Sequence, residues 1–564
     1  MNPRRESSFA AISCIVALAC APLACRVERP GDTVDLILTN GRIVTLDPGH
    51  PEAQAIAIRG DRIAAVGDDA TIRGLAGAAT RRIDLKGGTV LPGLIDAHGH
   101  VASLGERLAS LDLRGIGSVE EVAARVRQRA GEPLPAGAWI TGGGWDQNLW
   151  PGEQFPDHRR LTEASPDRPV LLRRVDGHAS WANRSALLAA GIARGTPDPE
   201  GGRIVRDARG EPTGVLVDNA MLLAEKAQPK PDREQIKAWI RLALDRCARA
   251  GLTEVHDAGV SREQVAAYRE LAEEGPLPLR VYLMWDGTTS DPIEPMVEQE
   301  PFVGYRGRLT LRAVKLMVDG AMGSRGAVFF DDYADAPGAK GLFVTAPEEI
   351  ERRTILALRR GYQVCTHAIG DRGIHEVLQA YERALAAVPV RDPRLRIEHL
   401  QAVAREDLPS LQRLGVIASM QPSHATSDMY WAEERIGALR GRGLYAWRWV
   451  LDLGIPVAAG SDFPVDPEQP LVGLHSAVTR QDLKNWPDGG WHPEQKMTLK
   501  EAIAAYTAGA AYAAFEEHDK GRIAQGMWAD LTILAEDLQA VPPERIPTVE
   551  VRATIVGGLP TRGF

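Results

Sequence analysis

The sequence predicts an α/β protein built around a (β/α)8 barrel, and three observations lead to this fold class. Between residues 91 and 464, eight short apolar runs with strand character alternate with segments of helical periodicity. Such alternation favours a parallel sheet with crossover helices, and eight units complete a barrel. Residue types that bind metals stand at the ends of several runs, where a barrel collects its functional groups at one mouth.

The predicted strands, in order along the chain, lie at 91–98, 252–259, 279–285, 311–320, 362–370, 395–400, 416–422 and 456–464. Helical periodicity fills several of the intervals between them. Two of these helical segments, 233–251 and 347–361, end in glycine after basic residues, which is a helix-stop signal. They provide the crossover connections that parallel strands need.

A large insertion is predicted after the first strand, because about 150 residues separate it from the second, far beyond normal loop length. Strand and helix signals in this stretch predict a folded subdomain at about 104–235, inside a barrel domain that spans 93–520. The insertion could recognise an apolar or aromatic part of a substrate. It holds four of the twelve tryptophans: Trp139, Trp145, Trp150 and Trp181.

The two ends of the chain predict a separate β-rich unit. Residues 33–92 consist of short alternating runs, with hairpin signals at Asn40-Gly41 and Gly60-Asp61. Residues 521–564 have the same character. We therefore expect one small β-sandwich assembled from both termini, with the barrel inserted between its halves.

Residues 1–25 have the features of a secretory signal peptide. Arg4 and Arg5 precede a short apolar stretch that is too short to span a membrane comfortably. Lipoprotein-type cleavage at Cys25 or at Cys20, a simply cleaved signal and an uncleaved anchor helix remain as alternatives. We expect a bacterial protein exported to the periplasm or held at a membrane by a lipid anchor.

The composition is that of a soluble globular protein, with 44% hydrophobic and 25% charged residues. A formal charge of −9 argues against nucleic acid as a partner and fits a small-molecule substrate. Beyond the signal region only Cys247 and Cys365 remain, which cannot form a disulfide framework and are expected to be packed apolar residues. The oligomeric state is left open.

Metal-ligand residue types end five of the predicted strands. His98 and His100 close the first strand, and side chains at i and i+2 share one face of a strand, so both could reach one ion. The fourth, fifth, sixth and eighth strands end with Lys315, His367, His399 and Asp462, respectively. A barrel would bring all six to the same mouth.

The chain resembles the amidohydrolase superfamily in motifs that extend over essentially all of it after the signal: LPGLIDAHGH, VKLMVDGAMGSRG, THAIGDRGIHEVL, RIEHLQ, QPSH, GSDFPV and GRIAQGMWADL. It is similar in particular to the amidohydrolase-3 subgroup, which includes N-substituted formamide deformylases. The resemblance implies a centre of one or two divalent ions at the barrel mouth. Its ligands would be His98, His100, Lys315, His367, His399 and Asp462.

Lys315 has two interpretations. The resemblance implies a lysine carboxylated by carbon dioxide that bridges two metal ions, and a buried lysine readily loses its proton and becomes nucleophilic. The alternative is an ion pair with a carboxylate such as Asp319, since a charged lysine is costly to bury alone. This residue decides whether the centre holds one ion or two.

Four further residues are weaker candidates. His178, in the predicted insertion, matches a motif of the subgroup, and His424 follows the seventh strand; both could contact substrate. Asp319 and Asp371 could orient metal ligands by accepting hydrogen bonds from them.

The resemblance implies an enzyme that hydrolyses a non-peptide C–N bond, in an N-acyl or N-formyl amide, by metal-activated hydroxide. The imidazole-rich ligand set favours zinc. Asp462 is expected both to bind metal and to pass a proton from the nucleophile to the leaving nitrogen. The same site could instead cleave lactones, carbamates or phosphotriesters, and a non-catalytic binding homologue is the remaining alternative.

Overall fold

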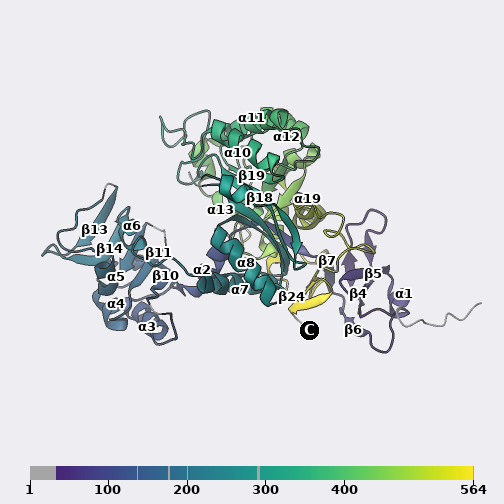
Figure 1. Ribbon diagram of the computed structural model, residues 1–564, viewed down its shortest axis with the longest axis horizontal. Coiled ribbons are helices and arrows are strands. Elements are labelled where there is room, and N and C mark those ends of the chain that lie inside the picture. Colours follow the sequence, from purple (N-terminus) through teal and green to yellow (C-terminus); the bar gives the residue numbers. More distant parts are fainter. Residues whose placement is uncertain (1–32, 136, 176–177, 200, 289–291, 563–564) are drawn as a thin grey trace, which may run out of the picture.

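The centre of the molecule is a barrel of eight parallel strands (Figure 1). The computed structural model describes residues 33–562 except 136, 176–177, 200 and 289–291. The barrel strands follow one another in chain order: β8 (Leu94–Gly99), β15 (Leu252–Val260), β16 (Arg280–Asp286), β18 (Leu309–Met317), β19 (Gln363–Ala368), β20 (Arg396–His399), β21 (Ile417–Met420) and β22 (Val457–Ala459). This confirms the predicted (β/α)8 fold.

The barrel closes through the residues that follow β22. The Asp462 N–H donates to the His98 carbonyl at 2.7 Å, and the His100 N–H donates to the Phe463 carbonyl at 2.7 Å. Gly99 and Phe463 form the parallel bridge between these segments. Closure therefore places the end of the last strand directly beside the end of the first.

Helices surround the barrel and bury their apolar faces against it. The main ones are α7 (Arg233–Arg249), α8 (Arg262–Glu274), α10 (Pro347–Arg359), α11 (Asp371–Ala387) and α17 (Pro470–Thr479). Helix α8 begins at a capping box in which the Ser261 and Gln264 side chains each bond the other's backbone N–H. One large apolar core links these helices to the strands.

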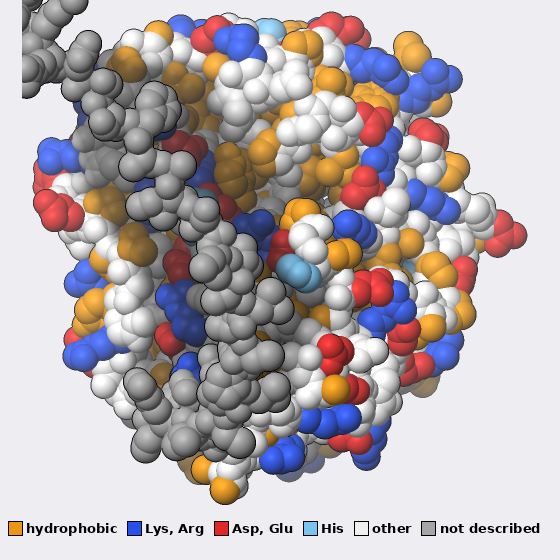
Figure 2. Space-filling model, turned by 90° about the vertical axis from the view of Figure 1, so that its right-hand side faces the viewer, with side chains coloured by type: hydrophobic (Ala, Val, Ile, Leu, Met, Phe, Trp, Pro, Cys, Tyr) orange, Lys and Arg blue, Asp and Glu red, His pale blue; other side chains and the backbone are white. Residues whose placement is uncertain are grey.

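Two sheets at the right of Figure 1 are built from the ends of the chain, the first from the N-terminal part alone and the second from both ends. One has the order β5 (Arg62–Gly67), β4 (Ala55–Arg59), β1 (Leu36–Thr39) and β6 (Arg81–Asp84). The other has the order β25 (Leu559–Arg562), β24 (Val551–Val556), β23 (Leu531–Leu534), β7 (Thr89–Pro92), β2 (Arg42–Val44) and β3 (Glu52–Ala53). Both contribute to one apolar core. On the face of the molecule seen in Figure 2, basic and acidic side chains are interspersed.

The insertion forms a mixed six-stranded sheet, left of the barrel in Figure 1. Its order is β13 (Gly202–Arg206), β14 (Pro212–Asp218), β12 (Ala179–Ala182), β11 (Val170–Arg174), β10 (Ile140–Trp145) and β9 (Leu111–Asp112). Its helices are α3 (Val119–Ala130), α4 (Arg159–Ala164), α5 (Arg184–Ala189) and α6 (Met221–Glu225). Helix α2 (Val101–Ala109) lies within the expected insertion but packs on the barrel helix α7, because its buried residues face the main core.

Three of the four tryptophans of the insertion form its core. Trp145, Trp150 and Trp181 are at most 4% exposed, and their ring centroids lie 5.8–6.0 Å apart. Each indole N–H donates to a backbone carbonyl, so the polar edge is also satisfied. These three rings therefore stabilise the insertion from within and are not open to a substrate.

The segment read as a signal peptide, residues 1–25, lies outside the described residues. Within the described part, no helix has both the length and the apolar character needed to cross a membrane. Cys247 and Cys365 are both free and buried, as packed apolar residues should be.

Replacing a core tryptophan should destabilise the insertion. We expect Trp145→Ala to cost about 3–5 kcal/mol, because it leaves a cavity among well-packed rings. Native-state hydrogen exchange across residues 111–218 would report the loss as faster exchange. Leu188→Ala, at a side chain that is 68% exposed in the same subdomain, should change stability by less than about 0.5 kcal/mol. Equal exchange in both variants would contradict the core assignment.

Candidate metal centre

A cavity of 420 Å³ opens at the carboxyl ends of the barrel strands. Its polar floor contains all six residues predicted as metal ligands: His98, His100, Lys315, His367, His399 and Asp462. Apolar side chains form part of its wall: Met317, Met322, Trp431 and Val465. The barrel thus gathers residues that are 364 positions apart in the sequence, from 98 to 462.

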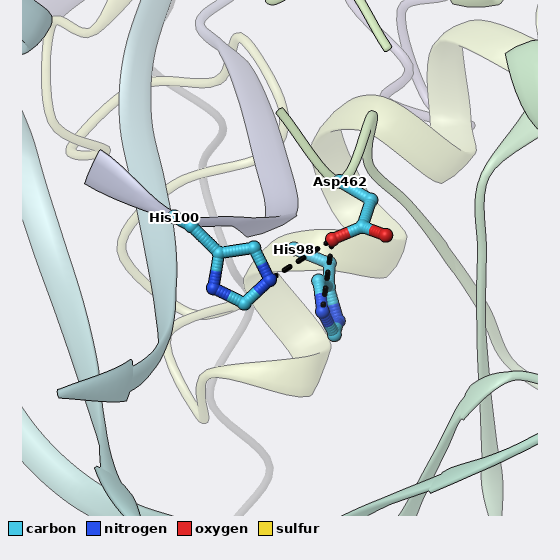
Figure 3. Close-up of side chains that lie close together, drawn as sticks. All are labelled: His98, His100 and Asp462. Carbon is cyan, nitrogen blue, oxygen red and sulfur yellow. Dashed lines mark ion pairs between the residues drawn. The ribbon is translucent and has the colours of Figure 1, made fainter. Parts of the chain in front are cut away.

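One group of ligand atoms joins the first strand to the last (Figure 3). Asp462 Oδ1 lies 3.0 Å from His100 Nε2 and 3.6 Å from His98 Nε2. One ligand atom from each residue falls within 4.8 Å of the other two, which is the spacing that a shared metal ion requires. This arrangement follows directly from barrel closure.

A second group shares Asp462. His424 Nε2 lies 3.8 Å from Asp462 Oδ2, and His399 completes a set whose ligand atoms also lie within 4.8 Å of one another. The His399 ring packs against those of His98 and His367, with centroids 4.8 and 4.5 Å away. His424, which the sequence suggested as a substrate contact, therefore stands among the candidate ligands.

Unusual backbone conformations aim two of these side chains. His399 ends β20 with φ +75°, and Asp462 has φ +59°, in the left-handed region that non-glycine residues rarely adopt. Such strain persists where the surrounding structure enforces it, commonly at functional sites. Asp96 helps to enforce it, because its carboxylate accepts the backbone N–H groups of both His98 and Ser461 at 3.1 Å.

Burial keeps three of the imidazoles neutral. It lowers the pKa of His98 to about 4 and that of His367 to about 3, and the positive charge of Lys315 adds to both shifts. Burial also holds the pKa of His399 well below its usual value. Neutral imidazole is the form that binds metal, so these rings can act as ligands near pH 7.

His100 and Asp462 behave as a pair. Burial lowers the pKa of His100, but the hydrogen bond and charge of Asp462 outweigh it and raise that pKa. Burial raises the pKa of Asp462, yet the hydrogen bond from His100 and the nearby histidines hold it well below its usual range. The Asp462 carboxylate is therefore ionised at neutral pH.

Lys315 lies inside the barrel with its Nζ 3.4 Å from His98 Nε2. Burial lowers its pKa. Among the described residues no carboxylate oxygen comes within 4.0 Å of Nζ, so the ion pair considered with Asp319 does not form. Asp319 instead accepts the backbone N–H groups of Val328, Ile369 and Gly370, at 2.9–3.0 Å.

The residues present fit a metal ion. Among the described side chains, His367 Nε2 and His424 Nε2 are buried polar atoms without a hydrogen-bond partner. An unpaired buried polar atom costs about 1–3 kcal/mol, which a bound cation would offset. Imidazole nitrogens and carboxylate oxygens are also the donors that zinc takes in catalytic sites.

The structure places the weaker candidates at different distances from the predicted ligands. Asp319 lies close to a predicted ligand, with its Oδ1 3.6 Å from His367 Nε2. Asp371 accepts the backbone N–H of Phe330 and contacts none of the predicted ligands, because it opens helix α11 rather than facing the floor. The structure does not bring His178 to the cavity either. Its exposed side chain pairs with Asp218 on the insertion, 2.9 Å away.

Sequence reasoning missed three buried residues that hold the centre in place: Asp96, Arg396 and Glu398. A usable signal was present, because charged residues interrupt otherwise apolar barrel strands in LIDAH and RIEH. Residues 396 and 398 also share one strand face by the i, i+2 rule. Which strand they would contact could not be read from the sequence.

Comparisons with known proteins show the family of the chain. The model of the amidohydrolase family matches residues 81–561. The protein LONG AFTER FAR-RED 3 of Arabidopsis thaliana is 36% identical over 545 residues, covering 94% of this chain and 91% of the relative. N-substituted formamide deformylase of Arthrobacter pascens is 28% identical, covering 93% and 98%. A solved metal-dependent hydrolase of Pyrococcus furiosus superposes with a TM-score of 0.75 at 28% identity, covering 89% of this chain and 99% of that one.

Proposed function

The chain belongs to the amidohydrolase family, and we propose that this metal-dependent hydrolase cleaves the C–N bond of an N-acyl or N-formyl amide. The observation that carries the proposal is the position of Asp462. Its carboxylate is ionised, lies between two groups of imidazoles and faces a cavity large enough for a small substrate.

The proposed ligands are those predicted from the sequence, with His424 added because it stands beside Asp462 Oδ2. Zinc is the cation that an imidazole-rich set with a carboxylate favours. When bound, such a cation supplies Lewis acidity, which lowers the pKa of water and polarises a carbonyl.

Asp462 is the proposed proton carrier. Its Oδ1 accepts the proton of the attacking water, and the same carboxyl group then protonates the leaving nitrogen. The carboxylate has two oxygens aimed differently, Oδ1 toward His98 and His100 and Oδ2 toward His424. One residue can therefore hold a cation and move a proton.

Lys315 is proposed to be carboxylated. Burial lowers its pKa, which favours the neutral amine that carbon dioxide requires, and no described carboxylate pairs with it. Carboxylation would convert an unfavourably buried cation into an anionic oxygen ligand at the same place.

The acyl side of the substrate is proposed to be small. The relative named N-substituted formamide deformylase supports a formyl group, and Met322 and Trp431 offer an apolar wall for the substituent on nitrogen. The site of action is proposed to lie outside the cytoplasm, on the signal-like residues 1–25 alone.

Removing the metal should abolish activity and lower stability. A chelator is expected to lower the melting temperature, because an ion that binds only the folded state at 100 times its Kd stabilises it by about 2.7 kcal/mol. Metal analysis of the purified protein, before and after chelation and after zinc is restored, provides the measurement. Less than half an equivalent of metal, with no activity regained, would overturn the proposed function.

Substituting the proton carrier should slow the chemical step. Asp462→Asn keeps the shape of the side chain but cannot take a proton, so kcat should fall at least about 100-fold. A panel of formamides, other N-acyl amides, a lactone, a carbamate and a phosphotriester would first identify the substrate class. Asp428→Asn, on the wall of the same cavity, serves as the control and should affect KM more than kcat. Full activity in Asp462→Asn would remove this residue from its role.

A further inference from the structure

A continuous chain of charged and polar contacts runs through the barrel interior beneath the metal centre. Its members are no more than 4% exposed: His98, Glu398, Arg396, His256, Glu254 and Lys520. Barrel interiors are normally filled by layers of branched apolar side chains. One end of this chain of contacts is His98, a candidate metal ligand, which connects the chain to the proposed function.

Next to the metal centre, this chain of contacts begins with a short contact between the candidate ligand His98 and Glu398. His98 Nδ1 lies 2.5 Å from Glu398 Oε2, and both side chains are fully buried. Arg396 holds the other side of the carboxylate, with its Nε 2.8 Å from Glu398 Oε1 and its Nη2 3.2 Å from Oε2. Because a guanidinium only donates, Glu398 Oε2 is the acceptor of the Arg396 Nη2 bond, whereas the contact between Nε and Oε1 is an ion pair without hydrogen-bond geometry.

We propose that Glu398 is a positioning residue for the metal centre, which fixes the tautomer and the ring orientation of His98. Accepting from Nδ1–H leaves the lone pair on His98 Nε2. That atom faces the floor of the cavity, 3.6 Å from Asp462 Oδ1 and 3.4 Å from Lys315 Nζ. A carboxylate behind a ligating imidazole also makes it a better donor to the metal. The inference rests on the proposed metal-dependent function.

Arg396 holds Glu398 and the neighbouring strands in place around His98. Besides Glu398 it donates to the Ala97 carbonyl at 2.6 Å and to Ser419 Oγ at 2.9 Å, so it ties β20 to β8 and β21 around His98. A buried ion pair brings little net stability compared with apolar packing. The Arg396–Glu398 pair is therefore explained by its part in positioning the candidate metal ligand His98.

The far end of the chain supplies a matched control. His256 Nδ1 lies 3.1 Å from Arg396 Nη1, and its Nε2 lies 3.1 Å from Glu254 Oε1. The other oxygen of Glu254, Oε2, contacts Lys520. Glu254 is thus a second buried glutamate that faces an imidazole and a cation. Its imidazole, however, belongs to His256, which is not a candidate ligand.

The test compares Glu398→Gln with Glu254→Gln by competition of the full-length protein with a chelator for zinc. Wild-type protein is measured first, since failure to bind zinc there would reject the proposed function rather than this inference. We expect Glu398→Gln to weaken zinc binding about 10–100-fold, as changes behind metal-bound histidines do. Glu254→Gln should stay within about twofold, with thermal unfolding of the metal-free forms recorded to compare their folding.

A double-mutant cycle separates positioning from general damage. In a His98→Ala background, Glu398→Gln should no longer alter zinc affinity, because its effect passes through the missing ring. If Glu398→Gln does not fold, Glu398→Asp replaces it, since that change keeps the charge but withdraws the carboxylate from Nδ1. Zinc binding within twofold of wild type in a folded Glu398 variant, or equal losses in the Glu398 and Glu254 variants, would overturn the proposal.

Discussion

Burying charge without leaving it unpaired is the constraint on which this barrel depends. An isolated ionised group inside a protein costs many kcal/mol, so each buried charge requires a partner of opposite sign or several hydrogen bonds. Arg396 and Glu398 meet this requirement together, and Lys520 contacts both Glu254 and Glu516 at the other end of the interior. Arg396 and Glu398 both lie on β20, and their further contacts with His98 and the Ala97 carbonyl on β8 and with Ser419 on β21 also fix how these strands lie around the metal centre.

Closure of the barrel then determines the chemistry at its mouth. Backbone hydrogen bonds between residues 98–100, at the end of β8, and residues 462–463, just after β22, bring a histidine pair and a carboxylate together. The same closure forces Asp462 into a left-handed conformation that aims its side chain at the cavity. A site built beside strand ends in this way is held more rigidly than one built on long loops, which suits the proposed roles of Asp462 as cation ligand and proton carrier.

The parts outside the barrel follow the ordinary logic of apolar packing. The insertion has its own tryptophan core, and the terminal sheets share a core because β7 pairs with β23 across almost the whole length of the chain. Of the residues that the structure describes in these two units, none lines the candidate metal centre. The parts of the wall that could distinguish substrates, such as Met322, Asp428 and Trp431, come instead from segments that follow barrel strands.

The sequence by itself determined the fold class, the approximate position of every barrel strand and the six residues that meet on the cavity floor. Local patterns were enough for these predictions, because strand periodicity and the end of an apolar run depend only on neighbouring residues. Only the tertiary structure placed His424 beside Asp462, kept His178 and Asp371 out of the cavity lining, and packed three tryptophans of the insertion into its core. It alone also paired His98 with Glu398, 300 residues away. Such contacts depend on which strands become neighbours when the barrel closes, and no short stretch of sequence carries that information.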